Sequence, residues 1–329
     1  MVLQSSPLVS VGLPVYNGER YITHAIESVL SQTYDRIELI ISDNASDDRT
    51  QEIACIYAEQ DPRVRYVRQA SNLGAARNFN HVFRLAQGEF FKWLAADEGV
   101  EPQFVELCVN SLNYNAEAVL ACTQYVIISE SGDNELYTCD NSLTANAAAD
   151  RFCKLIRDYK INVLPIWGLI RRAALQRTRL LLPYVRSDYW LMTELALLGP
   201  WVQSPEHLTH LRTHAKAYHR IKDARGGVEG QAEARWFDMQ NHARIVLPSW
   251  RRLREYTTIA LRSEESTAEK ARMIRYLYGP FLFHESKGMV KELLYNTGLG
   301  FLYKSVKYIY KSVFHGDNIH HGSSGHTCI

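Results

Sequence analysis

The chain has 329 residues, of which 46% are hydrophobic and 22% are charged. This composition is close to the average of globular proteins and excludes an intrinsically disordered chain. The 37 basic and 36 acidic side chains leave a net charge of +1, so no overall positive charge would attract nucleic acid. A chain of this length is expected to form one large domain or two fused ones.

Charge and cysteine usage narrow the class of protein further. Residues 1–125 carry more acidic than basic side chains, and residues 246–329 carry more basic ones. The six cysteines form no C-x-x-C pair and lack zinc-ligand spacing, so we expect reduced thiols in a reducing compartment. The start is too polar for a signal peptide, and no apolar run reaches the roughly 18 residues of a membrane span. We therefore expect a cytoplasmic protein.

Strand and helix patterns alternate over the first 125 residues. Short apolar runs predict strands at 8–14, 37–42, 64–67 and 90–94, and helical periodicity occupies 21–32, 50–59 and 75–86, with a further helix from about 102. This alternation predicts an α/β fold with a mainly parallel, Rossmann-like nucleotide-binding sheet covered by helices on both faces. Ligands of such sheets bind at the carboxyl ends of the strands.

The pattern loosens after residue 125. We expect a strand at 125–128, a helix at 147–159, a turn and short strand at 164–172, and a helix at 188–198. The chain from about 233 is predicted to be largely helical, and residues 316–329 to be loose. The C-terminal part is therefore expected to be a helical extension.

Three polar clusters follow predicted strands, at 14–19, 43–48 and 97–98. The glycine cradles of dinucleotide and triphosphate sites are missing from the first turn. Tyr16 could instead stack a base and Glu19 could bind a ribose, although an ordinary turn fits these residues equally well. The adjacent carboxylates of Asp97 and Glu98 suit Mg²⁺ or Mn²⁺ bound together with phosphates, with a solvated acid pair as the alternative.

Four stretches in this order carry a specific resemblance: 9–18 (VSVGLPVYNG), 28–33 (SVLSQT), 38–47 (ELIISDNASD) and 72–78 (NLGAARN). Together they closely resemble the family 2 glycosyltransferases, which have the A-type glycosyltransferase fold. The resemblance covers roughly residues 7–220 and is densest over the first 100. It implies an enzyme that moves a sugar from a nucleotide-diphosphate donor to an acceptor.

The resemblance assigns a role to each matching residue. Pro14, Tyr16 and Glu19 fall where the family holds the base and ribose. The base itself is fixed at the position of Asp43, beside Asn44, and Arg77 lies near the nucleotide.

The remaining matches concern the metal and the chemistry. Asp97 and Glu98 occupy the place of the metal and diphosphate motif, and His214 the place of a late histidine near the diphosphate, sometimes on the metal. Asp188 matches the catalytic base, and without the resemblance a helix N-cap would be the preferred interpretation.

One departure from the family pattern concerns the metal. The second acid is usually Asp, whereas Glu98 adds a methylene group, and Ala95 and Ala96 precede the pair. Mg²⁺ tolerates little displacement of its ligands, so the sequence does not determine whether this site binds a metal tightly enough for full activity.

The leading hypothesis is an inverting glycosyltransferase that needs Mn²⁺ or Mg²⁺ and uses a saccharide or lipid-linked acceptor, in cell-surface polysaccharide or glycan assembly. Residues 1–125 would bind the donor, 126–245 the acceptor, with the base, and 246–329 would form the extension. The alternatives are a catalytically weakened sugar-nucleotide or glycan-binding relative, and a nucleotidyltransferase, which would normally show a Gly-rich basic loop.

Residues 301–314 form an amphipathic pattern with an aliphatic stripe, aromatic borders and three lysines opposite. This pattern predicts an interfacial helix that would hold the enzyme at the inner face of the cytoplasmic membrane, helped by the basic C-terminal part. A helix that packs on the protein's own core is the equal alternative.

Overall fold

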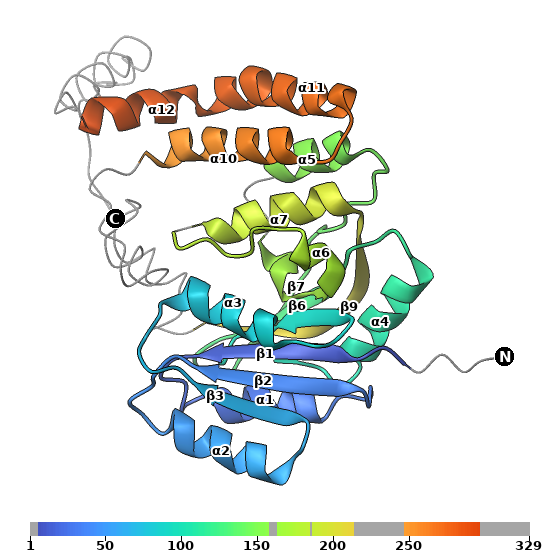
Figure 1. Ribbon diagram of the computed structural model, residues 1–329, viewed down its shortest axis with the longest axis vertical. Helices are drawn as coiled ribbons and strands as arrows, with labels where there is room; N and C mark the ends of the chain where they lie inside the picture. Colours follow the sequence, from blue (N-terminus) through green and yellow to red (C-terminus); the bar gives the residue numbers. More distant parts are fainter. Residues whose placement is uncertain (1–5, 158–162, 185, 214–246, 297–329) are drawn as a thin grey trace, which may run out of the picture.

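The computed structural model describes residues 6–157, 163–184, 186–213 and 247–296 (Figure 1). His214 and the predicted amphipathic helix at 301–314 lie outside the described residues. The described strands form one nine-stranded sheet in which the order β3-β2-β1-β4-β8-β6-β9-β5 runs from edge to edge, with β7 paired to β6.

The first half of the sheet is parallel, as predicted. β1 (Val9–Val15) lies between β2 (Ile37–Asp43) and β4 (Phe90–Trp93), and β3 (Val64–Arg68) pairs with β2. The helices α1 (Ile22–Leu30) and α2 (Thr50–Gln60) cover one face, and α3 (Ala75–Leu85) covers the other (Figure 1). The predicted strands and helices of this half are confirmed.

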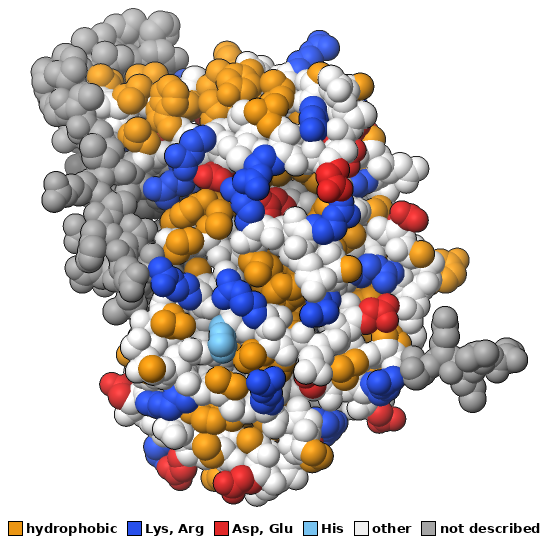
Figure 2. Space-filling view, in the orientation of Figure 1, with side chains coloured by type: hydrophobic (Ala, Val, Ile, Leu, Met, Phe, Trp, Pro, Cys, Tyr) orange, Lys and Arg blue, Asp and Glu red, His pale blue; other side chains and the backbone are white. Residues whose placement is uncertain are grey.

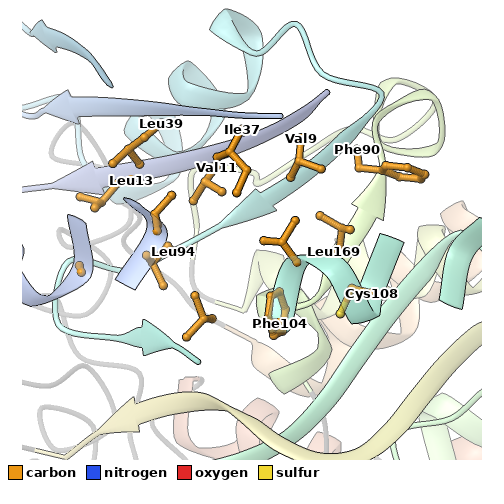
Figure 3. Packing of buried hydrophobic residues seen from close by; sticks show 14 of the residues in the cluster. Val9, Val11, Leu13, Ile37, Leu39, Phe90, Leu94, Phe104, Cys108 and Leu169 are labelled. Carbon is orange, nitrogen blue, oxygen red and sulfur yellow. The ribbon is translucent and has the colours of Figure 1, made fainter. Parts of the chain in front are cut away.

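Burial on both faces explains the continuous apolar runs. All seven residues of β1 are buried. Val9, Leu13 and Leu39 belong to the same buried cluster as Phe104 and Cys108 of α4 (Phe104–Tyr114), as Figure 3 shows. A strand enclosed by helices on both sides has no solvated face, so it does not alternate polar and apolar residues.

The second half of the sheet is mixed. β8 (Leu169–Arg171) runs antiparallel between β4 and β6 (Leu120–Ile128), and β9 (Trp201–Arg212) runs parallel to β6. The two-residue β5 (Gly99–Val100) pairs antiparallel with β9, and β7 (Asn134–Tyr137) with β6. The sequence did not predict β9, because this strand is only half buried and carries charged and histidine residues.

The proposed division at residue 125 falls inside β6, so strands from both parts share the sheet. The helices α5 (Ala148–Arg157), α6 (Arg172–Gln176) and α7 (Ser187–Leu198) and the 3-10 turn η1 (Leu164–Trp167) complete this part.

The helical extension comprises α10 (Pro248–Arg262), α11 (Thr267–Tyr276), the π turn η2 (Leu277–Phe281) and α12 (Leu282–Asn296). It packs on α5 and α7 (Figure 1) through a cluster in which Tyr256 makes edge contacts with Phe152, Trp190 and Phe281. Within the described ranges, no helix is both long and apolar enough to cross a bilayer.

Candidate functional site

The turn after β1 and the loop after β2 are bonded to each other. The backbone N–H of Asn17 donates to Ser46 Oγ at 2.9 Å, and that of Gly18 donates to Thr50 Oγ1 at 2.8 Å. Glu19 makes two hydrogen bonds to the loop after β2. Its backbone N–H donates to the Asp48 carboxylate, and its own carboxylate accepts from the backbone N–H of Arg49, both at 3.0 Å. The first two predicted donor motifs therefore form one unit at the carboxyl edge of the sheet.

Pro14 and Tyr16 occupy different settings within this unit. Pro14 is buried in β1, where it pairs with Ser42 of the neighbouring strand. Tyr16 follows the strand and is 50% exposed, so its ring is open to a planar ligand. Of these two residues, Tyr16 has the surface that could stack a base.

Asp43 is fully buried at the end of β2. Its Oδ1 accepts from the Ser46 N–H at 2.8 Å, and its Oδ2 accepts from the Tyr66 hydroxyl and from Arg68, each at 2.7 Å. Burial and the bond to Asp43 raise the pKa of Tyr66. The carboxylate thus holds the loop to β3, and its predicted contact with the base stays a prediction.

The third motif, at 72–78, is attached to the same loop. Asn44 donates to Asn72 Oδ1 at 2.9 Å and accepts from the Leu73 N–H at 2.8 Å. Inside the core, the Asn78 side chain accepts a hydrogen bond from the Ser42 hydroxyl and donates one to the Ser42 backbone oxygen. The side chain of Arg77 is exposed on the first turn of α3, beside these bonds.

The acidic turn formed by Asp97 and Glu98 connects β4 to β5. Arg212, the last residue of β9, donates from Nε to the backbone oxygen of Asp97 at 3.3 Å. The pairing of Gly99 with His210 holds the same two segments together. β9 therefore brings to the acidic turn a part of the chain more than 100 residues away, two residues before His214.

Glu98 is partly exposed as a residue, but its Oε2 atom is buried and has no hydrogen-bond partner among the described residues. Burial and the neighbouring Asp97 raise the pKa of the Glu98 carboxyl, and the Lys92 ammonium opposes this shift. An orphaned carboxylate oxygen next to a second carboxylate fits a divalent cation. Among the described residues, no three His, Cys, Asp or Glu side chains group closely enough to hold a metal alone. Substrate phosphates would complete the coordination.

Lys92 is buried in β4, beneath this turn. Its ammonium donates to the backbone oxygen of Trp167 and lies 4.5 Å from the centre of the Phe104 ring. Burial lowers the pKa of Lys92 to about 8. Neither Lys92 nor Arg212 was predicted from the sequence to lie near the site. A lysine within an apolar strand could have indicated the role of Lys92, whereas no local pattern indicates that of Arg212.

Asp188 is the second residue of α7, not its N-cap. The cap position belongs to Arg186, and the Asp188 carboxylate accepts from the N–H of Tyr189 at 3.1 Å. α7 packs against η1, whose Trp167 oxygen is bonded to Lys92. The helix that carries Asp188 is thus linked through η1 to β4, the strand that precedes the acidic turn.

Left-handed backbone conformations gather near the predicted site residues. Among the described residues, the non-glycine positions with positive φ are Asn17 (53°), Ala45 (63°), Leu180 (57°) and Arg186 (67°). Asn17 and Ala45 lie in the two interlocked turns, and Arg186 lies two residues before Asp188. Such conformations cost free energy and persist at functional turns when the surrounding structure enforces them.

A mainly parallel half-sheet whose carboxyl edge carries interlocked polar turns and an acidic pair defines a class of α/β proteins that bind nucleotides at strand ends. The family model "Glycosyl transferase family 2" matches residues 10–177, more than half of the chain. The chain belongs to this family, and the predicted family and fold are confirmed.

Three relatives show the range of similarity. An uncharacterized glycosyltransferase of Rickettsia typhi is 36% identical over 128 residues, covering 38% of this chain and 39% of its own length. GlyG of Streptococcus pneumoniae is 28% identical over 173 residues, covering 51% and 58% respectively. Chondroitin synthase of Escherichia coli is 37% identical over 120 residues, covering 36% and 17%. The match therefore spans less than two thirds of each of these relatives.

Solved structures show the same fold at low identity. TarS of S. aureus in complex with UDP-GlcNAc is 16% identical, with a TM-score of 0.60, and the match covers 87% of this chain and 79% of that one. The mannosyltransferase PcManGT of Pyrobaculum calidifontis, with GDP-Man and Mn²⁺, is 15% identical, with a TM-score of 0.52 and coverage of 93% and 81%. At these identities the likeness concerns the fold.

Proposed function

We propose that the protein is an inverting glycosyltransferase that moves a sugar from a nucleotide-diphosphate donor to a hydroxyl group of an acceptor. The observation that carries this proposal is the interlocking of the donor turns at the carboxyl edge of β1 and β2, in a chain of family 2. The nucleotide sugars bound to TarS and PcManGT support the donor class.

In this proposal the donor nucleotide binds over the interlocked turns. Tyr16 stacks on the base, Pro14 and Glu19 shape the turn that receives the ribose, and Arg77 offers a cation to the nucleotide. Asp43 and Asn44 fix the base, either directly or by fixing the loop to which they are bonded. Rigid turns reduce the ordering cost of binding.

The leaving diphosphate requires positive charge. Asp97 and Glu98, with His214, would hold Mn²⁺ or Mg²⁺, and the orphaned Glu98 oxygen supports this role. The bound ion would act as a Lewis acid that neutralises charge on the phosphates. Arg212 would keep the turn in place through the Asp97 backbone.

Asp188 is proposed as the general base. Its carboxylate would accept the proton of the acceptor hydroxyl while that oxygen forms a bond to the anomeric carbon and the bond to the diphosphate breaks. A single displacement of this kind inverts the anomeric configuration. The packing of its helix α7 against η1, whose Trp167 oxygen accepts a hydrogen bond from Lys92 of β4, supports this placement.

The acceptor is proposed to be a saccharide or lipid-linked saccharide in the assembly of a cell-surface polysaccharide or glycan, as the similarity to a chondroitin synthase supports. Residues 1–125 would then serve the donor and 126–245 the acceptor, with 246–329 as an extension. We propose a cytoplasmic location, with peripheral contact at the inner face of the membrane.

One observation favours a second candidate, a catalytically weakened sugar-nucleotide or glycan-binding relative. Glu98 stands where the family pattern usually has Asp, and Ala95 and Ala96 precede the pair of Asp97 and Glu98. A panel of nucleotide sugars, with and without Mn²⁺, separates the two by thermal shift and by release of the nucleoside diphosphate. Protection together with metal-dependent release supports the transferase, and protection alone supports the binding relative. If there is neither protection nor release, both candidates are contradicted.

A further inference from the structure

The helical extension exposes an apolar surface on the side away from the sheet. Phe283 is 85% exposed, Tyr278 53% and Val290 52%. Figure 2 shows hydrophobic side chains gathered along the upper edge of the molecule, over α11 and α12. A contiguous exposed patch of this kind is uncommon unless it binds something.

This surface is separate from the side of the extension that forms the core. Leu277, Phe281 and Met289 are buried in the cluster around Tyr256. Phe283, Lys287 and Val290 follow one another at helical spacing on an exposed face of α12. We call Phe283, Lys287 and Val290 the α12 outer face.

The charges of α12 are sorted between its two sides. Its acidic residues, Glu285 and Glu292, turn towards α10, where Glu285 pairs with Arg252 and Glu292 accepts from the Ser249 N–H at 2.9 Å. His284 and Lys287 are exposed. The outer face therefore combines an aromatic and an aliphatic side chain with one lysine, Lys287, and has no carboxylate of α12.

The charge distribution selects among the possible occupants. A two-fold contact between copies places the same patch on both partners and brings their lysines together. An anionic surface instead meets the lysine with opposite charge while it takes up the aromatic rings.

We propose that the α12 outer face docks on an anionic membrane surface, with Phe283 and Val290 in the acyl–headgroup boundary and Lys287 at the lipid phosphates. Apolar burial and electrostatic attraction then add, as in other interfacial helices. This inference goes beyond sugar transfer and does not depend on it.

The test is flotation of the full-length chain with vesicles of phosphatidylcholine, with or without phosphatidylserine. Binding is expected to require phosphatidylserine and to weaken with salt. Phe283→Ser and Lys287→Glu should each weaken partitioning about five- to tenfold, and the double variant more. Controls are Tyr114→Ser, which removes a 91% exposed aromatic from α4, and Arg65→Glu on β3, and neither should change binding.

Thermal melting and light scattering of every variant complete the experiment. Because the substituted side chains are exposed, melting temperatures should stay close to wild type. Equal flotation of the wild type and the double variant overturns the proposal, as does a lack of binding to phosphatidylserine vesicles. A dimer that the double variant converts to a monomer also overturns it and assigns the face to a second copy. No readout requires turnover, so a failure to bind vesicles would remove the proposed membrane contact and leave the proposed sugar transfer untouched.

Discussion

The hydroxyl of Tyr66 donates a hydrogen bond to Oδ2 of the fully buried Asp43 at 2.7 Å. Arg68 and the Ser46 N–H also donate hydrogen bonds to the Asp43 carboxylate, so this one side chain connects β3 to the loop after β2. Asp43 therefore shapes the donor turn whether or not it also contacts the base.

Tyr66→Phe should lower the free energy of unfolding by about 1.5–3 kcal/mol, because a buried carboxylate loses a donor. Nucleotides of every base should bind more weakly by a similar factor. Chemical denaturation and calorimetric titration measure the two effects. The matched control is Tyr57→Phe, which removes a hydroxyl bonded to exposed Glu27, and it should change neither quantity appreciably. A loss confined to one base would show that Asp43 reads the base directly.

Asp97→Asn should abolish metal-dependent turnover and leave the fold intact, because the turn also depends on backbone bonds such as that from Arg212. Product release with and without EDTA, together with circular dichroism, provides the measurement. Asp133→Asn, in an exposed loop, is the control. Normal turnover by the Asp97 variant, with no effect of EDTA, would rule out the metal role.

Glu98→Asp separates an adapted metal site from a decayed one. The shorter side chain moves its carboxylate by about one C–C bond, and Mg²⁺ is sensitive to that displacement. Because the orphaned oxygen of Glu98 belongs to a second carboxylate at the site, we expect lower activity and weaker Mn²⁺ affinity in the variant. Higher activity would instead support the weakened relative.

Asp188→Asn should reduce the rate about 10²–10⁴-fold, the usual effect of removing a general base. Stability and donor affinity should stay near wild type, since Asp188 is not the N-cap of α7. Single-turnover kinetics and nucleotide binding measure these quantities. Asp150→Asn, which alters a first-turn acid of α5, should keep the wild-type rate. An unchanged rate in the Asp188 variant would exclude it as the base.

The buried Lys92 is expected to make the free energy of unfolding of the protein depend on pH. Because the pKa of Lys92 falls from 10.5 to about 8 on folding, the unfolded chain binds more protons between these values. Stability therefore rises with pH across that window and is flat on either side. Relative to Lys92→Met, the wild type should gain roughly 1–3 kcal/mol between pH 8 and 10.5. Urea denaturation at several pH values tests this, and parallel curves would contradict it.

Ala45→Gly should stabilise the protein by up to about 1 kcal/mol, because glycine adopts the left-handed conformation at φ 63° without the clash of a side chain. Ala54→Gly, inside α2, should instead destabilise it by about 1 kcal/mol. Opposite shifts of the two melting temperatures are expected. A lower melting temperature for both variants would show that the loop gains nothing from relief of strain.

Local pattern was sufficient for much of the fold. The apolar runs at 9–15, 37–43 and 90–93 became parallel strands because strands buried on both faces need apolar residues at every position. The turns at 14–19 and 43–48 followed from their places after these strands. β9 was not predicted, because its half-buried pattern has meaning only beside its partner, β6.

The sequence by itself determined the family, the parallel half of the sheet and the residue types at its carboxyl edge, since these depend on neighbours within a few positions. The tertiary structure decided what those residues contact. Arg212 reaches Asp97 across 115 positions, and Lys92 reaches the oxygen of Trp167 across 75. It also turned the acids of α12 inward and left Phe283 outside. Such pairings depend on how the sheet curls and how the helices pack, and no local periodicity encodes them.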